Sequence, residues 1–270
     1  MAVTKEQKKL FNEKVKPYKN FLDDLKKEVS TLRVAVRKNA RLAPYIEMRL
    51  AQLSLQKSST LVLMSRLSLK IQNFKNESYC NDARKEISSN LASLMKIVGE
   101  DLDGGLSENK EKLKLIERMT PYQRLQLLRG FKAVTEELKE VLGSNSKWRW
   151  YFPDLHLKTA ILARNMFDFS TYEKISKKPD ADDYRSWLDF FQFLTDELQL
   201  AAQEYRSRYE LSTKEVSDLQ AIQKIFEFTK KIYLLTGNKT ELNKVSTSLD
   251  AINEMIETTL GKGKKGGGKK

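Results

Sequence analysis

The sequence predicts an all-α protein built from elongated antiparallel helical hairpins, a helix bundle with coiled-coil-like packing. The main observation is a set of apolar residues spaced alternately four and three apart, which places them on one stripe of a helix. The second is a scarcity of helix breakers, with 11 Gly and 5 Pro among 270 residues. No alternating apolar and polar run of strand type competes with this pattern.

The first two helices are expected at residues 4–42 and 44–75. The stripe of the first comprises Phe11, Val15, Tyr18, Leu22, Leu25, Val29, Leu32 and Val36. The stripe of the second comprises Ile46, Leu50, Leu53, Lys57, Thr60, Met64, Leu67, Ile71 and Phe74, with two polar interruptions. Thr4 and Gln7 have the spacing of a capping box, Pro17 either kinks the first helix or starts it afresh, and Pro44 suits the first turn of the second. Together these helices form the first predicted hairpin.

Further helices are expected at residues 79–98, 107–119, 121–142, 154–167, 181–209, 212–236 and 238–260. Ser107 is a candidate for opening the second of these, and Thr120 with Gln123 forms the strongest capping signal in the chain. Ser212 with Glu215, and Asn238 with Glu241, have the same spacing. The last two helices form a second hairpin.

Four regions follow from this arrangement. They are an N-terminal helical region (residues 1–143), an aromatic connector (144–153), a C-terminal helical region (154–260) and a Lys- and Gly-rich tail (261–270). Gly143 to Ser146 gives the best candidate boundary. The tail holds nothing apolar to bury and is expected to be disordered.

The residues typical of catalysis or metal binding are sparse. His156 is the only histidine and Cys80 the only cysteine, and neither stands in a nucleophile or metal motif. Asp180, Asp182 and Asp183 could bind a divalent cation, but they sit at the start of a helix and fit capping better. Asp101 and Asp103 before Gly104 resemble only a fragment of a calcium loop. We therefore expect no catalytic residues, no metal and no cofactor. A pocket of carboxylates or tyrosines between helices stays open as a third, enzymatic alternative.

The aromatic connector is the first candidate binding site. Its aromatic rings fit either a plug between the two halves of the chain, with Arg149 stacked on a ring, or a docking surface for a protein partner. Stacking of unpaired bases would use the same residue types, but the surrounding segment is nearly neutral. Its aromatic and basic residues are Trp148, Arg149, Trp150, Tyr151 and Phe152.

Basic residues form the second candidate site. The net charge of +13 is uneven, since residues 1–100 hold 20 Lys and Arg against 10 Asp and Glu, and residues 101–260 hold 24 against 26. Candidate anion-binding residues are Lys8, Lys9, Lys16, Lys19, Lys26, Lys27, Arg37, Lys38, Arg41, Lys262, Lys264, Lys265, Lys269 and Lys270, beside Lys5, Lys14 and Arg33. A solvated face is the plain alternative to a site for phosphates or anionic lipids.

These observations predict a non-enzymatic scaffold or adaptor acting through protein–protein contacts, self-association included. The alternative is an electrostatic binder of nucleic acid or of an anionic membrane. The charged residues 1–14, the lack of an apolar run of roughly 20 residues and the single cysteine predict a cytoplasmic protein without a transmembrane segment.

Overall fold

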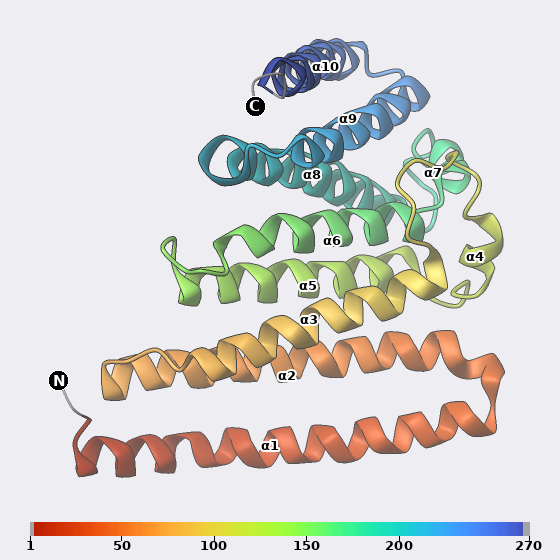
Figure 1. Ribbon diagram of the computed structural model, residues 1–270. Helices are drawn as coiled ribbons and strands as arrows, with labels where there is room; N and C mark the ends of the chain where they lie inside the picture. Colours follow the sequence, from red (N-terminus) through yellow and green to blue (C-terminus); the bar gives the residue numbers. More distant parts are fainter. Residues whose placement is uncertain (1–2, 267–270) are drawn as a thin grey trace. The chain divides into compact units, whose positions relative to one another are not determined.

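The computed structural model describes residues 3–266, with side chains for residues 3–260, and all regular structure in this part is helical. The all-α fold is thus as expected (Figure 1). The α-helices are α1 (Lys5–Lys38), α2 (Ala43–Gln72), α3 (Glu77–Val98), α4 (Lys110–Lys114), α5 (Pro121–Leu142), α6 (Phe152–Met166), α7 (Phe169–Ile175), α8 (Tyr184–Arg208), α9 (Val216–Thr236) and α10 (Lys239–Gly266). The shorter turns are η1 (Ala40–Leu42), η2 (Arg149–Tyr151) and a π-helical turn (Tyr209–Thr213).

The chain divides into two compact units. The first comprises Met1–Gly99 and Lys112–Phe152, and the second comprises Glu100–Glu111 and Pro153–Lys270. The segment 100–111, which the sequence placed in the N-terminal region, therefore belongs to the second unit. The second unit resumes at Pro153, the last residue of the predicted connector.

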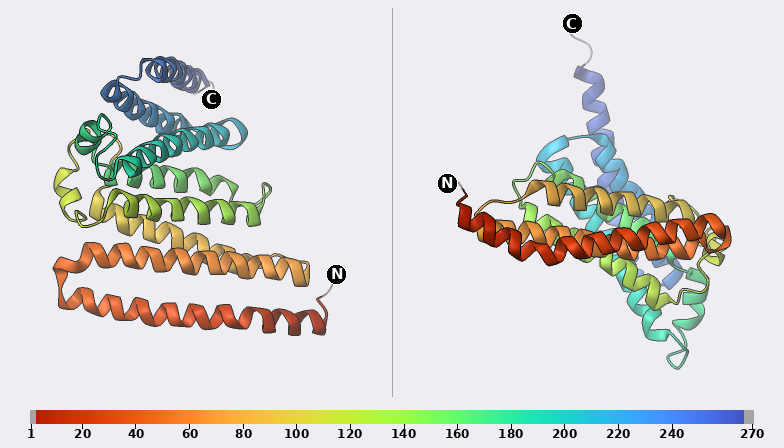
Figure 2. Two further views of the ribbon diagram at one scale, coloured as in Figure 1. Left: turned by 180° about the vertical axis from the view of Figure 1, so that it is seen from behind. Right: turned by 90° about the horizontal axis from the view of Figure 1, so that it is seen from below.

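In the first unit α2 is the inner helix. It packs against α1, α3 and α5, and the left view of Figure 2 shows α1 and α2 side by side. The predicted stripe of α1 meets α2, where Phe11, Val15 and Met64 form a buried cluster. Pro17 lies inside α1 without ending it.

The inner position explains why α2 buries small polar residues as well as its apolar stripe. Ser54, Ser65 and Ser68 are all buried, and each hydroxyl has a partner. Ser65 donates to the carbonyl oxygen of Asn76, and Ser68 donates to that of Phe74. A small side chain lets a neighbouring helix approach closely, and the hydrogen bond offsets the cost of burying its oxygen.

In the second unit α9 packs against both α8 and α10. Gly237 ends α9 with a positive φ of 69°, a conformation that glycine adopts without a steric cost. The side chain of Asn238 then accepts a hydrogen bond from the amide of Glu241 at the start of α10, as expected from the sequence. The helix continues to Gly266, beyond the expected boundary at residue 260, and residues 267–270 of the predicted tail lie outside the described residues.

Two other helix starts are as expected. Thr4 with Gln7, and Thr120 with Gln123, form complete capping boxes. Pro44 lies in the first turn of α2.

Several local predictions were wrong. Asp183 occupies the N-cap position of α8 with φ 61° and makes no capping hydrogen bond with its side chain. Ser212 lies within the π-helical turn, and α9 begins at Val216 with no side-chain cap from Glu215. The helix expected at 107–119 is reduced to α4, and the short α7 was not expected at all.

Replacing Thr120 with Ala should lower the free energy of unfolding by about 1 kcal/mol, because the amide of Gln123 loses its acceptor at the start of α5. The matched control is Ser107→Ala, since the exposed Ser107 caps no α-helix. We expect the control to change stability by less than about 0.5 kcal/mol. Urea denaturation followed by circular dichroism measures both. Equal effects of the two substitutions would contradict this assignment of the helix start.

Candidate interaction surfaces

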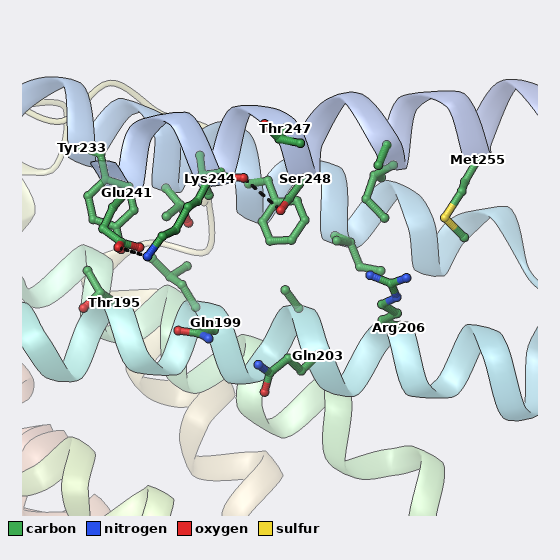
Figure 3. Close-up of a pocket in the computed structure, with 18 residues that line it drawn as sticks. Thr195, Gln199, Gln203, Arg206, Tyr233, Glu241, Lys244, Thr247, Ser248 and Met255 are labelled. Atoms are coloured by element: carbon green, nitrogen blue, oxygen red, sulfur yellow. Dashed lines mark hydrogen bonds and ion pairs between the residues drawn. The ribbon is translucent and has the colours of Figure 1, made fainter. Parts of the chain in front are cut away.

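A groove in the second unit separates α8 from α10 and has α9 as its floor (Figure 3). Its volume is about 450 Å³. The floor is mainly apolar and includes Ile222 and Phe226. From α8 the wall consists of Thr195, Leu198, Gln199, Ala202, Gln203 and Arg206, and from α10 it consists of Glu241, Lys244, Val245, Thr247, Ser248, Ala251, Ile252 and Met255.

Small residues widen the middle of this groove. Ala202 lies on the α8 wall, and Ser248 with Ala251 lies on the α10 wall. Gln199 and Gln203 are exposed on the α8 wall, one helical turn apart, and each offers an amide donor and acceptor to whatever enters. The groove thus combines an apolar floor with hydrogen-bonding groups along one edge.

One end of the groove holds titratable side chains. The Nζ atom of Lys244 lies 2.6 Å from a carboxylate oxygen of Glu241, and the ring of Tyr233 lies beside this pair (Figure 3). Partial burial raises the pKa of Tyr233, and the charges of Glu241 and Asp196 add to this effect. Tyr233 therefore stays a neutral hydrogen-bonding group at physiological pH.

A polar network fixes the corner where α8 turns into α9. The guanidinium of Arg208 lies 2.6 Å from Asp218 and 3.0 Å from Asp154. Thr213, in the π-helical turn, donates a hydrogen bond to Asp218, and Tyr205 donates one to Asp154. Burial opposes the charge of Arg208, but the hydrogen bond to Asp218 and the charge of Asp154 outweigh it and raise the pKa of Arg208.

The side chain of Arg164 anchors the segment 100–111 to α6. Arg164 is buried, and its Nη2 atom donates to the carbonyl oxygens of Gly104 and Gly105, both at 2.8 Å. A side chain on Gly104 would come within 3.1 Å of the same nitrogen. The Asp-Gly-Gly segment thus closes over an arginine, which explains why it belongs to the second unit.

Residues 144–152 of the aromatic connector lie in the first unit and are only partly buried. Phe152 is in the core, whereas Trp148, Arg149, Trp150 and Tyr151 are half-buried. The guanidinium of Arg149 lies 4.4 Å from the ring of Trp150.

A second arginine, which the sequence did not indicate, stacks on the same connector. The guanidinium carbon of Arg84, on α3, lies 4.0 Å from the ring centre of Trp148 and 4.5 Å from that of Tyr151. These cation–π contacts join the connector to α3. Its role as a docking surface stays a prediction.

The remaining candidate residues are placed as follows. His156 is buried, with its Nδ1 atom 3.8 Å from Glu197. Cys80 is buried beside Ser65, and burial raises the pKa of its thiol, which disfavours the reactive thiolate. Among the side chains of residues 3–260, no group of three or more His, Cys, Asp or Glu residues is arranged to hold a metal ion.

The basic candidates fall into two groups. Those of residues 5–41 are all exposed, along α1 and η1. Those of the tail, Lys262, Lys264, Lys265, Lys269 and Lys270, lie outside the described side chains. None of the helices within residues 3–266 has the length and apolar character needed to cross a membrane.

Comparison with known proteins gives one match. A protein-family model, the TP0443 family, matches residues 7–260. The chain belongs to the TP0443 family. The match begins in the first turn of α1 and ends within α10, and it therefore includes parts of both units. No curated protein and no solved structure matches the chain.

Replacing Arg208 with Met should lower the free energy of unfolding by about 3–5 kcal/mol, because Asp218, whose side chain is 3% exposed, would lose its charged partner. The control is Arg206→Met two residues earlier, where the ion pair with Glu210 is exposed. We expect the control to cost less than about 1 kcal/mol. Urea denaturation of both variants tests this, and a loss at Arg208 no larger than at Arg206 would contradict it.

The contact between Arg84 and Trp148 should give a coupling energy of about 0.5–1 kcal/mol in a double-mutant cycle with Arg84→Met and Trp148→Leu. The control cycle pairs Lys147→Met with Trp148→Leu, because the Lys147 ammonium lies farther from the ring, at 5.5 Å. Unfolding free energies of the single and double variants give both values. A coupling for Arg84 no greater than that for Lys147 would show that the stacking is not energetically significant.

Proposed function

We propose that this protein is a non-enzymatic adaptor that binds a protein partner in the groove between α8 and α10. The main support is the groove itself, which has a volume of about 450 Å³ and an apolar floor between walls formed by α8 and α10. Grooves of this kind receive amphipathic helices in many proteins. A partner helix laid there would pack against α8, α9 and α10 together.

The length of the groove fits a few turns of helix. Its α8 wall runs from Thr195 to Arg206, about 16 Å at the helical rise of 1.5 Å per residue. The small side chains of Ala202, Ser248 and Ala251 leave room for larger apolar side chains of the partner. Gln199 and Gln203 would then hydrogen-bond to polar groups along the side of the partner helix.

The proposal places the protein in the cytoplasm. The lone cysteine supports this, since Cys80 is buried and has no second cysteine with which to form an internal disulfide. A second copy of this chain is one partner to be considered, as the sequence indicated.

Photo-crosslinking from the groove tests the proposal. A photoreactive phenylalanine analogue placed at Ser248 should crosslink a protein partner in cells of the native host, because this exposed residue lines the groove. The same analogue at Asn243 is the matched control, since Asn243 is exposed on α10 but does not line the groove. Mass spectrometry of the crosslinked peptides should identify an amphipathic helical segment.

A blocking substitution completes this test. Ser248→Trp would fill the groove, so in a pull-down it should reduce recovery of the partner identified by crosslinking at least tenfold, whereas Asn243→Trp should leave that recovery unchanged. Circular dichroism confirms that both variants are folded. Equal crosslinking from the two positions, or none from Ser248, would overturn the proposal.

A further inference from the structure

Helix α1 carries its charges on separate sides. At about 100° per residue, most of its basic residues fall within one sector of about 140° beside the buried stripe, which we call the basic flank. The basic flank comprises Lys5, Lys8, Lys9, Lys16, Lys19, Lys26, Lys27, Arg33, Arg37 and Lys38, with Asp23 as its one acidic residue. The opposite flank holds Glu6, Glu13, Asp24 and Glu28 with a single Lys14.

The structure leaves the basic flank open to solvent. All ten basic side chains are exposed. Lys26 and Lys27 form ion pairs with Asp23 and Asp24. These pairs are exposed to solvent and therefore contribute little to stability. The other eight make no hydrogen bond or ion pair through their side chains with any residue that the structure describes.

We infer that the basic flank of α1 binds the phosphate backbone of a double-stranded nucleic acid. The argument is charge complementarity over an extended length. Helix α1 has 34 residues and is about 50 Å long, and cations occur along all of it. A compact anion would use only one part of such a row, whereas a duplex presents phosphates continuously.

The spacing of the cations supports a duplex. Lys9 and Lys16 are seven residues apart, as are Lys19, Lys26 and Arg33. Seven residues correspond to about 10 Å along the helix, close to the width of about 12 Å of the DNA major groove. Successive cations can therefore reach phosphates on the two sides of a groove. The basic flank lacks aromatic side chains, on which the bases of a single strand would stack.

A membrane fits less well. A helix lying on a lipid surface needs its apolar residues between the lysines, so that both face the bilayer. The exposed apolar residues Leu10 and Phe21 instead lie on the opposite flank of α1. Val34 is the one exposed apolar residue with a large side chain within the basic flank.

The test is fluorescence anisotropy of the full chain with labelled duplexes of about 20 base pairs, which are longer than α1 at 3.4 Å per pair. A DNA duplex and an RNA duplex of the same sequence show which of the two nucleic acids binds more tightly. A single strand of that sequence shows whether binding requires a duplex. We expect the duplex to bind at about 50 mM NaCl and its affinity to fall at least tenfold at about 200 mM NaCl. The affinity for the single strand should be at least threefold lower than that for the duplex.

The variant replaces Lys8, Lys9, Lys16 and Lys19 with Gln, and the control replaces Lys85, Lys112, Lys174 and Lys178, which are also exposed and remove the same charge. The flank variant should lose at least tenfold in affinity, and its slope of log affinity against log salt should fall by about 3 to 4. The control should stay within twofold of the original chain. Circular dichroism establishes that both are folded.

Three outcomes would overturn the inference. They are no binding of either duplex at low salt, an equal loss in the flank and control variants, and binding confined to vesicles of phosphatidylglycerol and phosphatidylcholine. The last outcome would assign the flank to a membrane. None of them bears on the groove, because Ser248 and the other groove residues are unchanged in every variant.

Discussion

In each unit, a helix that packs against more than one neighbour must bury more than one face. In the first unit this helix is α2; in the second it is α9, and α6 is likewise buried over most of its length. Burying several faces demands close packing and a hydrogen-bond partner for each buried polar atom. Ser65 and Ser68 of α2 and the network around Asp218 at the start of α9 meet this demand. Helices α1 and α10, which pack mainly on α2 and α9, then need only one buried stripe.

This division between inner and outer helices produces the surfaces from which function is proposed. Helix α1 packs mainly on α2, so its flanks are free to separate their charges. Helix α10 packs mainly on α9, and α8 lies on another side of α9, which leaves the groove between them. The basic flank of α1 and the groove between α8 and α10 both arise because only part of the circumference of α1 and α10 is buried. Binding at either surface would depend on charge and shape and would involve no catalytic residue.

The helices could be predicted because periodicity and capping are local. The α5 boundaries and the Thr120 cap follow from adjacent residues, as does the stripe of α1. Contacts between distant residues could not be predicted in this way. The groove needs three helices brought together, and the closure of the Gly104 segment over Arg164 joins residues about 60 apart in the chain. The stacking of Arg84 on Trp148 is another such contact. The capping prediction for Asp183 was wrong because an acidic residue before a helix is typical of a cap, yet the backbone of Asp183 adopts a left-handed conformation and its side chain makes no capping hydrogen bond.

Hydrogen–deuterium exchange of the intact chain, without a partner, tests the distinction between inner and outer helices most directly. In the first unit amide exchange should be slower in α2 than in α1, and in the second unit it should be slower in α9 than in α10, because an amide is protected according to the packing that must open to expose it. Protection of α1 and α10 equal to that of α2 and α9 would contradict the account, since the flanks and the groove would then already be covered.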